Sequence, residues 1–279
     1  MRKDYKDMQE YWEEFYKKAE EKLGEDGLGI YSVCYAGQSS WRNKFTDWLQ
    51  NGTFQRLLNK CGSLEGKKAL DIGTGAGRWA TRLLERGLKV TAIDSNERII
   101  ERNKRLFPEI DFRNMLITAL GFEDNHFDLV TSVTVLHHIP YEKQKEAIRE
   151  ITRVTKQGKY ILILESINTN SALPTMFANS PARWTELFGE NGCKKLASVG
   201  HEYIPLISAA SHLGHLRRHS VKTRASTSAR EHHAASPRLF RVAETGIILI
   251  SYPVEIFCQH IVPGHFARQA GILFQKTAL

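Results

Sequence analysis

The segment of this sequence best suited to chemistry is a short glycine loop between an apolar stretch and a helical one. In Ala69 to Trp79 (ALDIGTGAGRW), glycines stand at positions 73, 75 and 77. Glycines let the main chain approach a ligand closely, and the free amides of the following helix favour a negatively charged group. Asp71 precedes the first glycine by two residues, and its carboxylate would repel a diphosphate but suits an ammonium. The loop therefore predicts a site for a zwitterionic or cationic ligand.

A nicotinamide dinucleotide is the main competing ligand for such a loop. The dinucleotide pattern is G-x-G-x-x-G, but this loop is G-x-G-x-G, with Arg78 where the final glycine would allow close helix packing. Asp94 ends the apolar run LKVTAID, where it could accept hydrogen bonds from ribose hydroxyls, a feature that both ligand classes share. The glycine pattern and Asp71, rather than Asp94, therefore disfavour a dinucleotide.

The elements that must position these residues follow from Lys67 onward, where short apolar runs alternate with amphipathic helical stretches. The expected strands are KKALDI, LKVTAID, IDF, FDLVTSV and KYILILES, and the expected helices cover 77–86, 96–106 and 141–155. A helix from about 181 to 190, an edge strand at 194–203 and a terminal strand at 271–276 follow. This alternation predicts an α/β fold: a Rossmann-like, doubly wound, mostly parallel sheet with helices on both faces and an antiparallel C-terminal strand.

Three pieces of this sequence together resemble the motifs of class I S-adenosylmethionine-dependent methyltransferases. They are Asp71-Ile72-Gly73-Thr74-Gly75-Ala76-Gly77, then Asp94, and then FDLVTSVTVLHHIP from Phe127 to Pro140. The chain is most similar to the broad small-molecule group that includes ubiquinone and menaquinone biosynthesis enzymes. The resemblance covers residues 67–165, about a third of the chain, and is far more specific than a glycine loop alone.

The resemblance implies S-adenosylmethionine as cofactor and assigns a role to each matching residue. Gly73, Gly75 and Gly77 would line the methionine moiety, Asp71 would help to hold its ammonium, and Asp94 would bind the ribose. A Gly-Asp pair that often contacts adenine in the family is replaced here by Met115 and Leu116. Adenine recognition would then use the backbone at Leu116 and Ile117, and Thr74 and Ser132 complete the expected cofactor set.

Candidate catalytic groups lie at the carboxyl ends of the fourth and fifth expected strands, where open α/β sheets bind ligands. His137 or His138 could remove a proton from a hydroxyl acceptor, since the pKa of histidine lies near working pH. A packed or solvent-facing histidine pair is the favoured alternative. Glu165 closes YILILE on the same edge, as a catalytic group or as a salt-bridge partner. Asp128 is expected to be structural.

The ends of the chain show only periodicity. Residues 1–62 are expected to form an N-terminal helical cap, 63–203 the cofactor-binding core, 204–267 an excursion, and 268–279 the terminal strand. The helix expected from Trp41 to Lys60 has Asn51-Gly52 as a candidate break. An aromatic set either caps the site or packs in the core, and it comprises Tyr5, Trp12, Phe15, Tyr16, Tyr31 and Tyr35.

The net charge of +8 is concentrated in one segment. Residues 212–238 contain six Lys and Arg against one Glu, so five of the eight net charges fall there. We expect a solvated mobile loop flanked by helical turns at 239–249 and 254–261, with nucleic-acid binding as the less favoured reading. There is no signal-peptide pattern and no apolar run of about 20 residues, so the expected location is the cytoplasm. Four cysteines without metal-ligand spacing predict buried free thiols and no metal.

The sequence thus predicts an enzyme that transfers a methyl group from S-adenosylmethionine to an O, N or C atom of a small-molecule acceptor. The alternatives are methylation of RNA or protein, a catalytically inactive S-adenosylmethionine-binding protein, and, less favoured, a nicotinamide oxidoreductase. Neither the acceptor nor the oligomeric state can be read from the residues.

Overall fold

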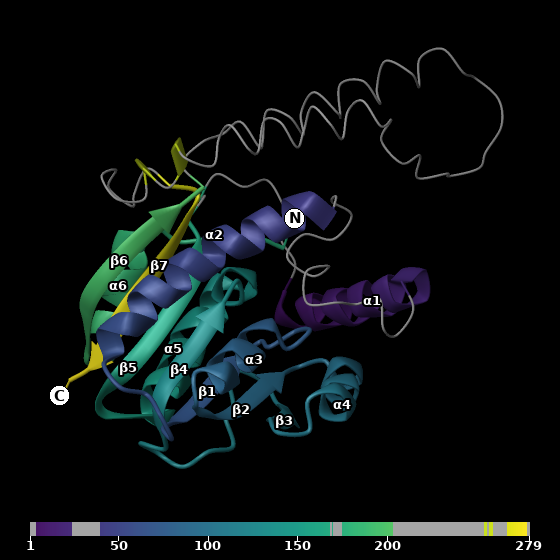
Figure 1. The fold of residues 1–279 in the computed structure, drawn as a ribbon, viewed down its shortest axis with the longest axis horizontal. Helices are drawn as coiled ribbons and strands as arrows, with labels where there is room; N and C mark the ends of the chain where they lie inside the picture. Colours follow the sequence, from purple (N-terminus) through teal and green to yellow (C-terminus); the bar gives the residue numbers. More distant parts are fainter. Residues whose placement is uncertain are drawn as a thin grey trace.

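The computed structural model describes residues 4–23, 40–167, 169, 175–202, 254–255, 257–258 and 267–277. Their central feature is a seven-stranded sheet in the order β3-β2-β1-β4-β5-β7-β6 (Figure 1). The strands are β1 (Lys68–Ile72), β2 (Lys89–Asp94), β3 (Asp111–Asn114), β4 (Phe127–Val133), β5 (Thr155–Ser166), β6 (Cys193–His201) and β7 (Gln269–Lys276). Strands β1 to β5 pair in parallel, and β7 is antiparallel to both β5 and β6. The predicted fold class is confirmed.

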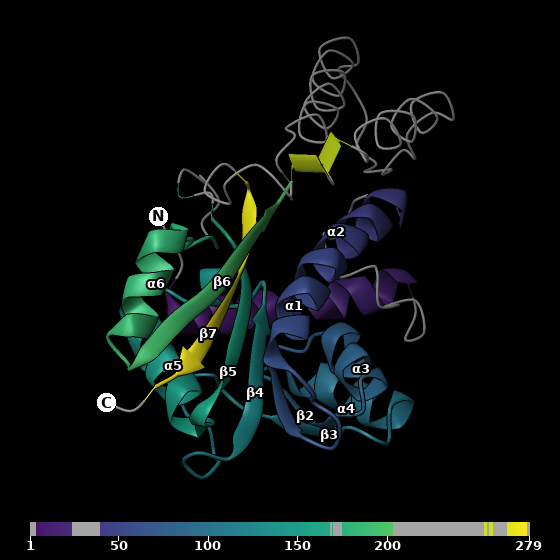
Figure 2. The ribbon, with the colours of Figure 1, turned by 60° about the vertical axis from the view of Figure 1, so that its left-hand side comes forward.

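Helices cover both faces of this sheet (Figure 2). They are α1 (Tyr5–Leu23), α2 (Ser40–Leu58), α3 (Arg78–Glu85), α4 (Glu97–Leu106), α5 (Tyr141–Val154) and α6 (Pro181–Gly189), with short 3-10 turns at η2 (Asn59–Cys61) and η3 (Leu136–His138). Apolar side chains of α2, α3 and α4 build the core on one face, and those of α5 and α6 build the core on the other. The sheet is therefore the middle of three layers.

The local sequence explains why the elements begin where they do. All seven residues of β4 are buried, as expected of a parallel strand covered on both faces. Helix α4 begins after Asn96, whose side chain accepts a hydrogen bond from Ile99 N at 3.0 Å, and α6 begins after Ser180, which caps Arg183 N in the same way. Each N-cap side chain pairs with a free amide of the first helical turn and so fixes the residue at which its helix begins.

Helix α2 is continuous through Asn51-Gly52, so the candidate break there is wrong. A glycine inside a helix costs about 1 kcal/mol, which is less than the burial of Phe54 and Leu57 on the same helix contributes. The helix also lies very close to β7. A Cβ atom added at Gly271 would stand 2.7 Å from Leu57 Cδ1 and 2.7 Å from Thr53 Cγ2. Helix α2 is therefore part of the packed core on its face of the sheet.

Several predictions fall on residues outside the described part of the chain: the basic loop at 212–238, the helical turn at 239–249, Tyr31 and Tyr35. Of the turn expected at 254–261, residues 254, 255, 257 and 258 are described and are helical. The division at 62, 203 and 267 stays a prediction. Cys61 and Cys193 are buried free thiols, whereas Cys258 is partly exposed. No helix in the described ranges is long and apolar enough to cross a membrane.

Candidate active site

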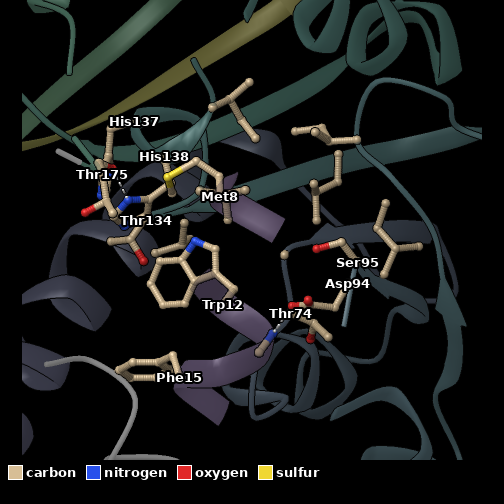
Figure 3. A pocket seen from close by; sticks show the side chains of 18 of the residues that line it. Met8, Trp12, Phe15, Thr74, Asp94, Ser95, Thr134, His137, His138 and Thr175 are labelled. Carbon is tan, nitrogen blue, oxygen red and sulfur yellow. Dashed lines mark hydrogen bonds between the residues drawn. The ribbon is translucent and has the colours of Figure 1, made fainter. Parts of the chain in front are cut away.

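A cavity of about 450 Å³ lies at the carboxyl ends of the parallel strands, with α1 against it. The β1–α3 loop, the end of β2, the turn after β4 and the end of β5 all contribute lining residues. Figure 3 shows Thr74, Asp94 and Ser95 at one end and the two histidines, His137 and His138, at the other. Helix α1 places side chains between the two ends, so one cavity joins the glycine loop to the histidine pair.

The glycine loop is held in the shape that the strand-to-helix turn requires. Gly73 has φ +65°, in the left-handed region, and a Cβ atom there would overlap Val135 Cγ2. Gly75 N donates to Asp94 Oδ2 at 2.9 Å, and Gly75 O accepts from Asn103 Nδ2 at 2.7 Å. These contacts fix the loop against β2 and α4, and they leave its cavity side to a ligand.

Asp71 lies just behind the cavity wall, with its carboxylate buried. Its Oδ1 accepts from Thr131 Oγ1 at 2.9 Å. Its Oδ2 and the Oγ1 of Thr74, which lines the cavity, are buried and form no well-aligned hydrogen bond among the described residues, although the Thr74 hydroxyl is near enough to lower the pKa of Asp71. Burial raises the pKa of Asp71 to about 6, more than hydrogen bonding and the Arg78 charge lower it. A ligand with an ammonium group would supply the missing donors and charge, so these residues fit the amino-acid end of S-adenosylmethionine.

Asp94 stands at the next strand end and faces the cavity. Its Oδ1 accepts from Asn96 N at 3.0 Å, and its Oδ2 accepts from Gly75 N. Burial raises the pKa of Asp94, and the backbone amides around it oppose that shift. Carboxylate oxygens have several lone pairs each, so Asp94 retains acceptor capacity for a ribose diol.

The expected cofactor set divides into residues on the cavity wall and residues behind it. Gly73, Thr74, Gly75, Asp94 and Ile117 line the cavity. Asp71, Gly77, Leu116 and Ser132 do not line it. Met115, adjacent to the half-buried Leu116, does line the cavity, so the thioether side chain of Met115 forms the apolar surface there.

At the other end, His137 and Glu165 form a buried pair. His137 Nδ1 lies 2.5 Å from Glu165 Oε2. The same carboxylate accepts the backbone amides of three successive residues: Val135 N at 3.2 Å, Leu136 N at 3.0 Å and His137 N at 3.2 Å. Ser166 N also lies 3.3 Å from Nδ1, but the Glu165 carboxylate is much nearer and can only accept, so we assign a proton to Nδ1, which leaves Nε2 of His137 as the proton acceptor. Ser132 Oγ donates to Glu165 Oε1 at 3.4 Å, so Ser132 lies with this pair rather than on the cofactor wall.

His138 has a different environment from its neighbour. Its Nδ1 lies 2.8 Å from the carbonyl oxygen of Thr175, and its ring meets the ring of Trp12 edge to face at 4.9 Å between centroids. Burial, with the adjacent His137, lowers the pKa of His138 to about 3. The structure thus places both histidines on the cavity, but only His137 has a carboxylate behind it.

Several lining residues were missed or left open by the sequence. The aromatic side chains Tyr5, Trp12, Phe15 and Tyr16 of α1 do line the cavity, and an amphipathic pattern does not say which surface its apolar face covers. Thr134, with φ +58°, lines the cavity directly after β4, and no sequence signal marks it. Asp128 is structural as predicted, since it accepts from Lys68 N and pairs with Lys156 at 2.8 Å.

Comparisons with known proteins agree with this geometry. Residues 69–158 match the family described as a methyltransferase domain. A demethylmenaquinone methyltransferase of Renibacterium salmoninarum is 34% identical over 117 residues, which make up 42% of this chain and 48% of that protein. A ubiquinone biosynthesis O-methyltransferase of Alkalilimnicola ehrlichii is 30% identical over 114 residues, or 39% of this chain and 45% of that protein. The chain thus spans about half the length of the curated relatives it matches.

Solved structures share the fold. The 4+2 cyclase SpnF superposes with a TM-score of 0.62 at 16% identity, covering 100% of this chain and 98% of that one. A magnesium protoporphyrin IX methyltransferase from Synechocystis PCC 6803, solved with bound S-adenosylmethionine, gives a TM-score of 0.54 at 17% identity, covering 70% of this chain and 90% of that one.

Proposed function

We propose that this protein transfers the methyl group of S-adenosylmethionine to a small-molecule acceptor, because residues 69–158 match a methyltransferase domain and the cavity beside them fits that cofactor. One observation carries the proposal: a single cavity joins the glycine loop, with Thr74 on its wall and the buried Asp71 behind it, to a histidine backed by a buried carboxylate. The first end suits the ammonium of the cofactor, and the second suits the removal of a proton from the acceptor.

Residues of the glycine loop and of β2 would hold the cofactor. Asp71 and Thr74 would accept its ammonium, Asp94 its ribose, and the side chains of Met115 and Ile117 would pack against its base. When bound, S-adenosylmethionine supplies a methyl group that its sulfonium has already activated. The protein therefore needs no electrophile of its own, and its remaining tasks are alignment of the acceptor and removal of a proton.

His137 is the proposed general base. With Nδ1–H donated to Glu165, the Nε2 lone pair of His137 is available to take a proton from an acceptor hydroxyl. The buried Glu165 carboxylate then faces the resulting imidazolium and stabilises its charge. Glu165 accepts the amides of the η3 turn as well, so it holds both the tautomer and the position of the base.

Helix α1 would exclude water from the reaction. Met8, Trp12 and Phe15 lie along the cavity between its two ends (Figure 3). Their apolar surfaces lower the local dielectric constant, which strengthens the interaction of Asp71 with an ammonium.

Cofactor binding and methyl transfer are tested separately. Calorimetric titration with adenosylhomocysteine and with NADH should give heat of binding for the first alone. Incubation with a metabolite extract and S-adenosylmethionine should give a product heavier by 14 Da in mass spectrometry, and His137→Ala should abolish that product without loss of adenosylhomocysteine affinity. Preference for NADH would overturn the proposal. Adenosylhomocysteine binding without methyl transfer across broad panels would favour the inactive cofactor-binding alternative.

RNA or protein methylation rests on the basic segment at 212–238. Deletion of that segment should leave tRNA binding, measured against salt concentration, unchanged if the acceptor is a small molecule. A steep loss of binding on deletion would move the assignment to nucleic acid. The cytoplasmic location stays a prediction from the sequence.

A further inference from the structure

The tautomer of His138 is fixed by the backbone carbonyl group of Thr175. The carbonyl oxygen of Thr175 can only accept, so the contact of 2.8 Å requires a proton on Nδ1 of His138. Nε2 of the neutral ring then carries no proton and has a free lone pair. Because burial keeps the pKa of His138 far below neutrality, the ring stays uncharged at working pH and Nε2 remains a hydrogen-bond acceptor. The ring lines the cavity, so a donor on a ligand can meet it.

Aromatic rings of α1 form the wall next to this acceptor. Trp12 contacts His138 edge to face, and Phe15 and Tyr11 pack on Trp12 with ring centroids at 5.2 Å and 5.3 Å. All three α1 residues line the cavity. A cluster of rings offers a broad apolar surface on which a flat ligand packs well.

Among the described residues, this end of the cavity offers no charge for an anion. Among the described lining residues, Arg78 is the only Lys or Arg, and it is bound to Asp47 at 3.0 Å. The wall beyond β5 is made of amides, in which Gln50 Nε2 donates to Gln269 Oε1 at 3.0 Å. His201 Nε2 also lies 3.0 Å from Gln269 Oε1, and burial lowers the pKa of His201 to about 4, so this wall is neutral. An anionic ligand would be desolvated here without a countercharge.

We propose, building on the proposed function, that the methyl acceptor is an uncharged, flat, apolar compound bearing a hydroxyl, and that His138 selects it by accepting a hydrogen bond from that hydroxyl at Nε2. The hydroxyl bound to His138 keeps its proton, and His137, whose ring centroid lies 4.2 Å from that of His138, removes the proton from the other group of the acceptor, the one that is methylated. His138 is thus a specificity-determining residue, and the two histidines have different tasks.

Matched small probes test this selection. Phenol has the ring and the donor, anisole has the ring without the donor, and benzoate has the ring with a negative charge. Titrations followed by ligand-observed NMR on the protein saturated with adenosylhomocysteine should show phenol binding at least about tenfold more tightly than anisole and benzoate, since one unmet buried hydrogen bond is worth about that factor. The same titrations are repeated without adenosylhomocysteine.

Variants assign the preference to His138. His138→Phe keeps a ring against Trp12 and should bring the phenol-to-anisole ratio to about one, and His138→Gln, which keeps an acceptor, should restore part of it. His126→Phe is the control, because His126 lies away from the cavity beside Lys68. In the unmodified protein, the 15N resonance of His138 Nε2 should shift with phenol and not with anisole, which tests the contact even if His138→Phe does not fold.

Equal affinity for phenol and anisole in the unmodified protein, or a ratio unchanged in His138→Phe, would overturn the selection by His138. If the unmodified protein prefers phenol but does not bind adenosylhomocysteine, the result counts against the proposed function and not against His138. The two outcomes can be told apart because the phenol preference is also measured without adenosylhomocysteine.

Discussion

Replacement of Glu165 by glutamine should change both the stability of the fold and the position of a proton. Glu165 is fully buried, with two backbone amides on Oε1 and the His137 amide and Nδ1 on Oε2. In Glu165→Gln, an NH2 group replaces one carboxylate oxygen. It cannot accept, so it faces N–H groups that have lost their hydrogen-bond acceptor. At the Oε1 position it would leave two backbone amides unpaired. At the Oε2 position, His137 can move its proton to Nε2 and accept at Nδ1, so one backbone amide is left unpaired.

The second arrangement costs less, and an unpaired buried amide is worth about 1–3 kcal/mol. For a domain of this size, about 3 °C of melting temperature corresponds to 1 kcal/mol, so we expect a decrease of about 3–9 °C in thermal unfolding. The same arrangement places a proton on Nε2 of His137 and removes the lone pair that a base needs. Product formation in the extract assay should therefore fall by about 100-fold or more, with adenosylhomocysteine affinity unchanged.

Two measurements on Glu165→Gln decide the matter: thermal unfolding by circular dichroism, and the His137 tautomer from 15N NMR. Glu146→Gln is the control, since Glu146 forms an exposed ion pair with Lys143 whose loss should cost under about 1 kcal/mol. A melting temperature within about 1 °C of the unmodified protein, together with a proton still on Nδ1 of His137, would refute the reasoning.

Three further predictions follow from buried contacts. The pKa of Asp71 is raised from an ordinary 3.8 to about 6, so its ionisation lowers the free energy of unfolding as pH rises from about 4 to 6, by about 3 kcal/mol in full. Asp71→Asn should remove this pH dependence of the free energy of unfolding, measured by urea denaturation. The same variant should remove the gain in adenosylhomocysteine affinity that the unmodified protein shows as pH rises through 6. Asp47→Asn should lose about 3 kcal/mol or more in the same assay, because Arg78 and Arg82 share that buried carboxylate, and a loss below 1 kcal/mol would contradict this. Gly271→Ala should cost about 1–3 kcal/mol through overlap with Leu57 and Thr53, and an unchanged melting temperature would show that α2 can move aside.

The sheet and its glycine loop could be predicted because their signals are local. A buried strand reads as a continuous apolar run, as in β4, and the turn after β1 needs glycine at position 73 for its backbone conformation and close approach. The continuity of α2 could not be predicted, since it depends on tertiary burial of Phe54 and Leu57, which outweighs a local helix-breaking signal.

The pairing within the candidate site was also beyond the sequence. Nothing in a linear pattern separates two adjacent histidines, and only the fold shows that Glu165 stands behind His137 whereas the Thr175 carbonyl stands behind His138. The role of α1 depended in the same way on which surface its aromatic face covers.

The register between β6 and β7 has a consequence for how this protein can vary. His201 pairs directly with Gln269, and Arg268 N donates to Glu202 O, so the chain leaves and re-enters the sheet at neighbouring points. Because the entropy lost in closing a loop grows only slowly with its length, the free-energy cost of joining these two strand ends depends little on how many residues connect them.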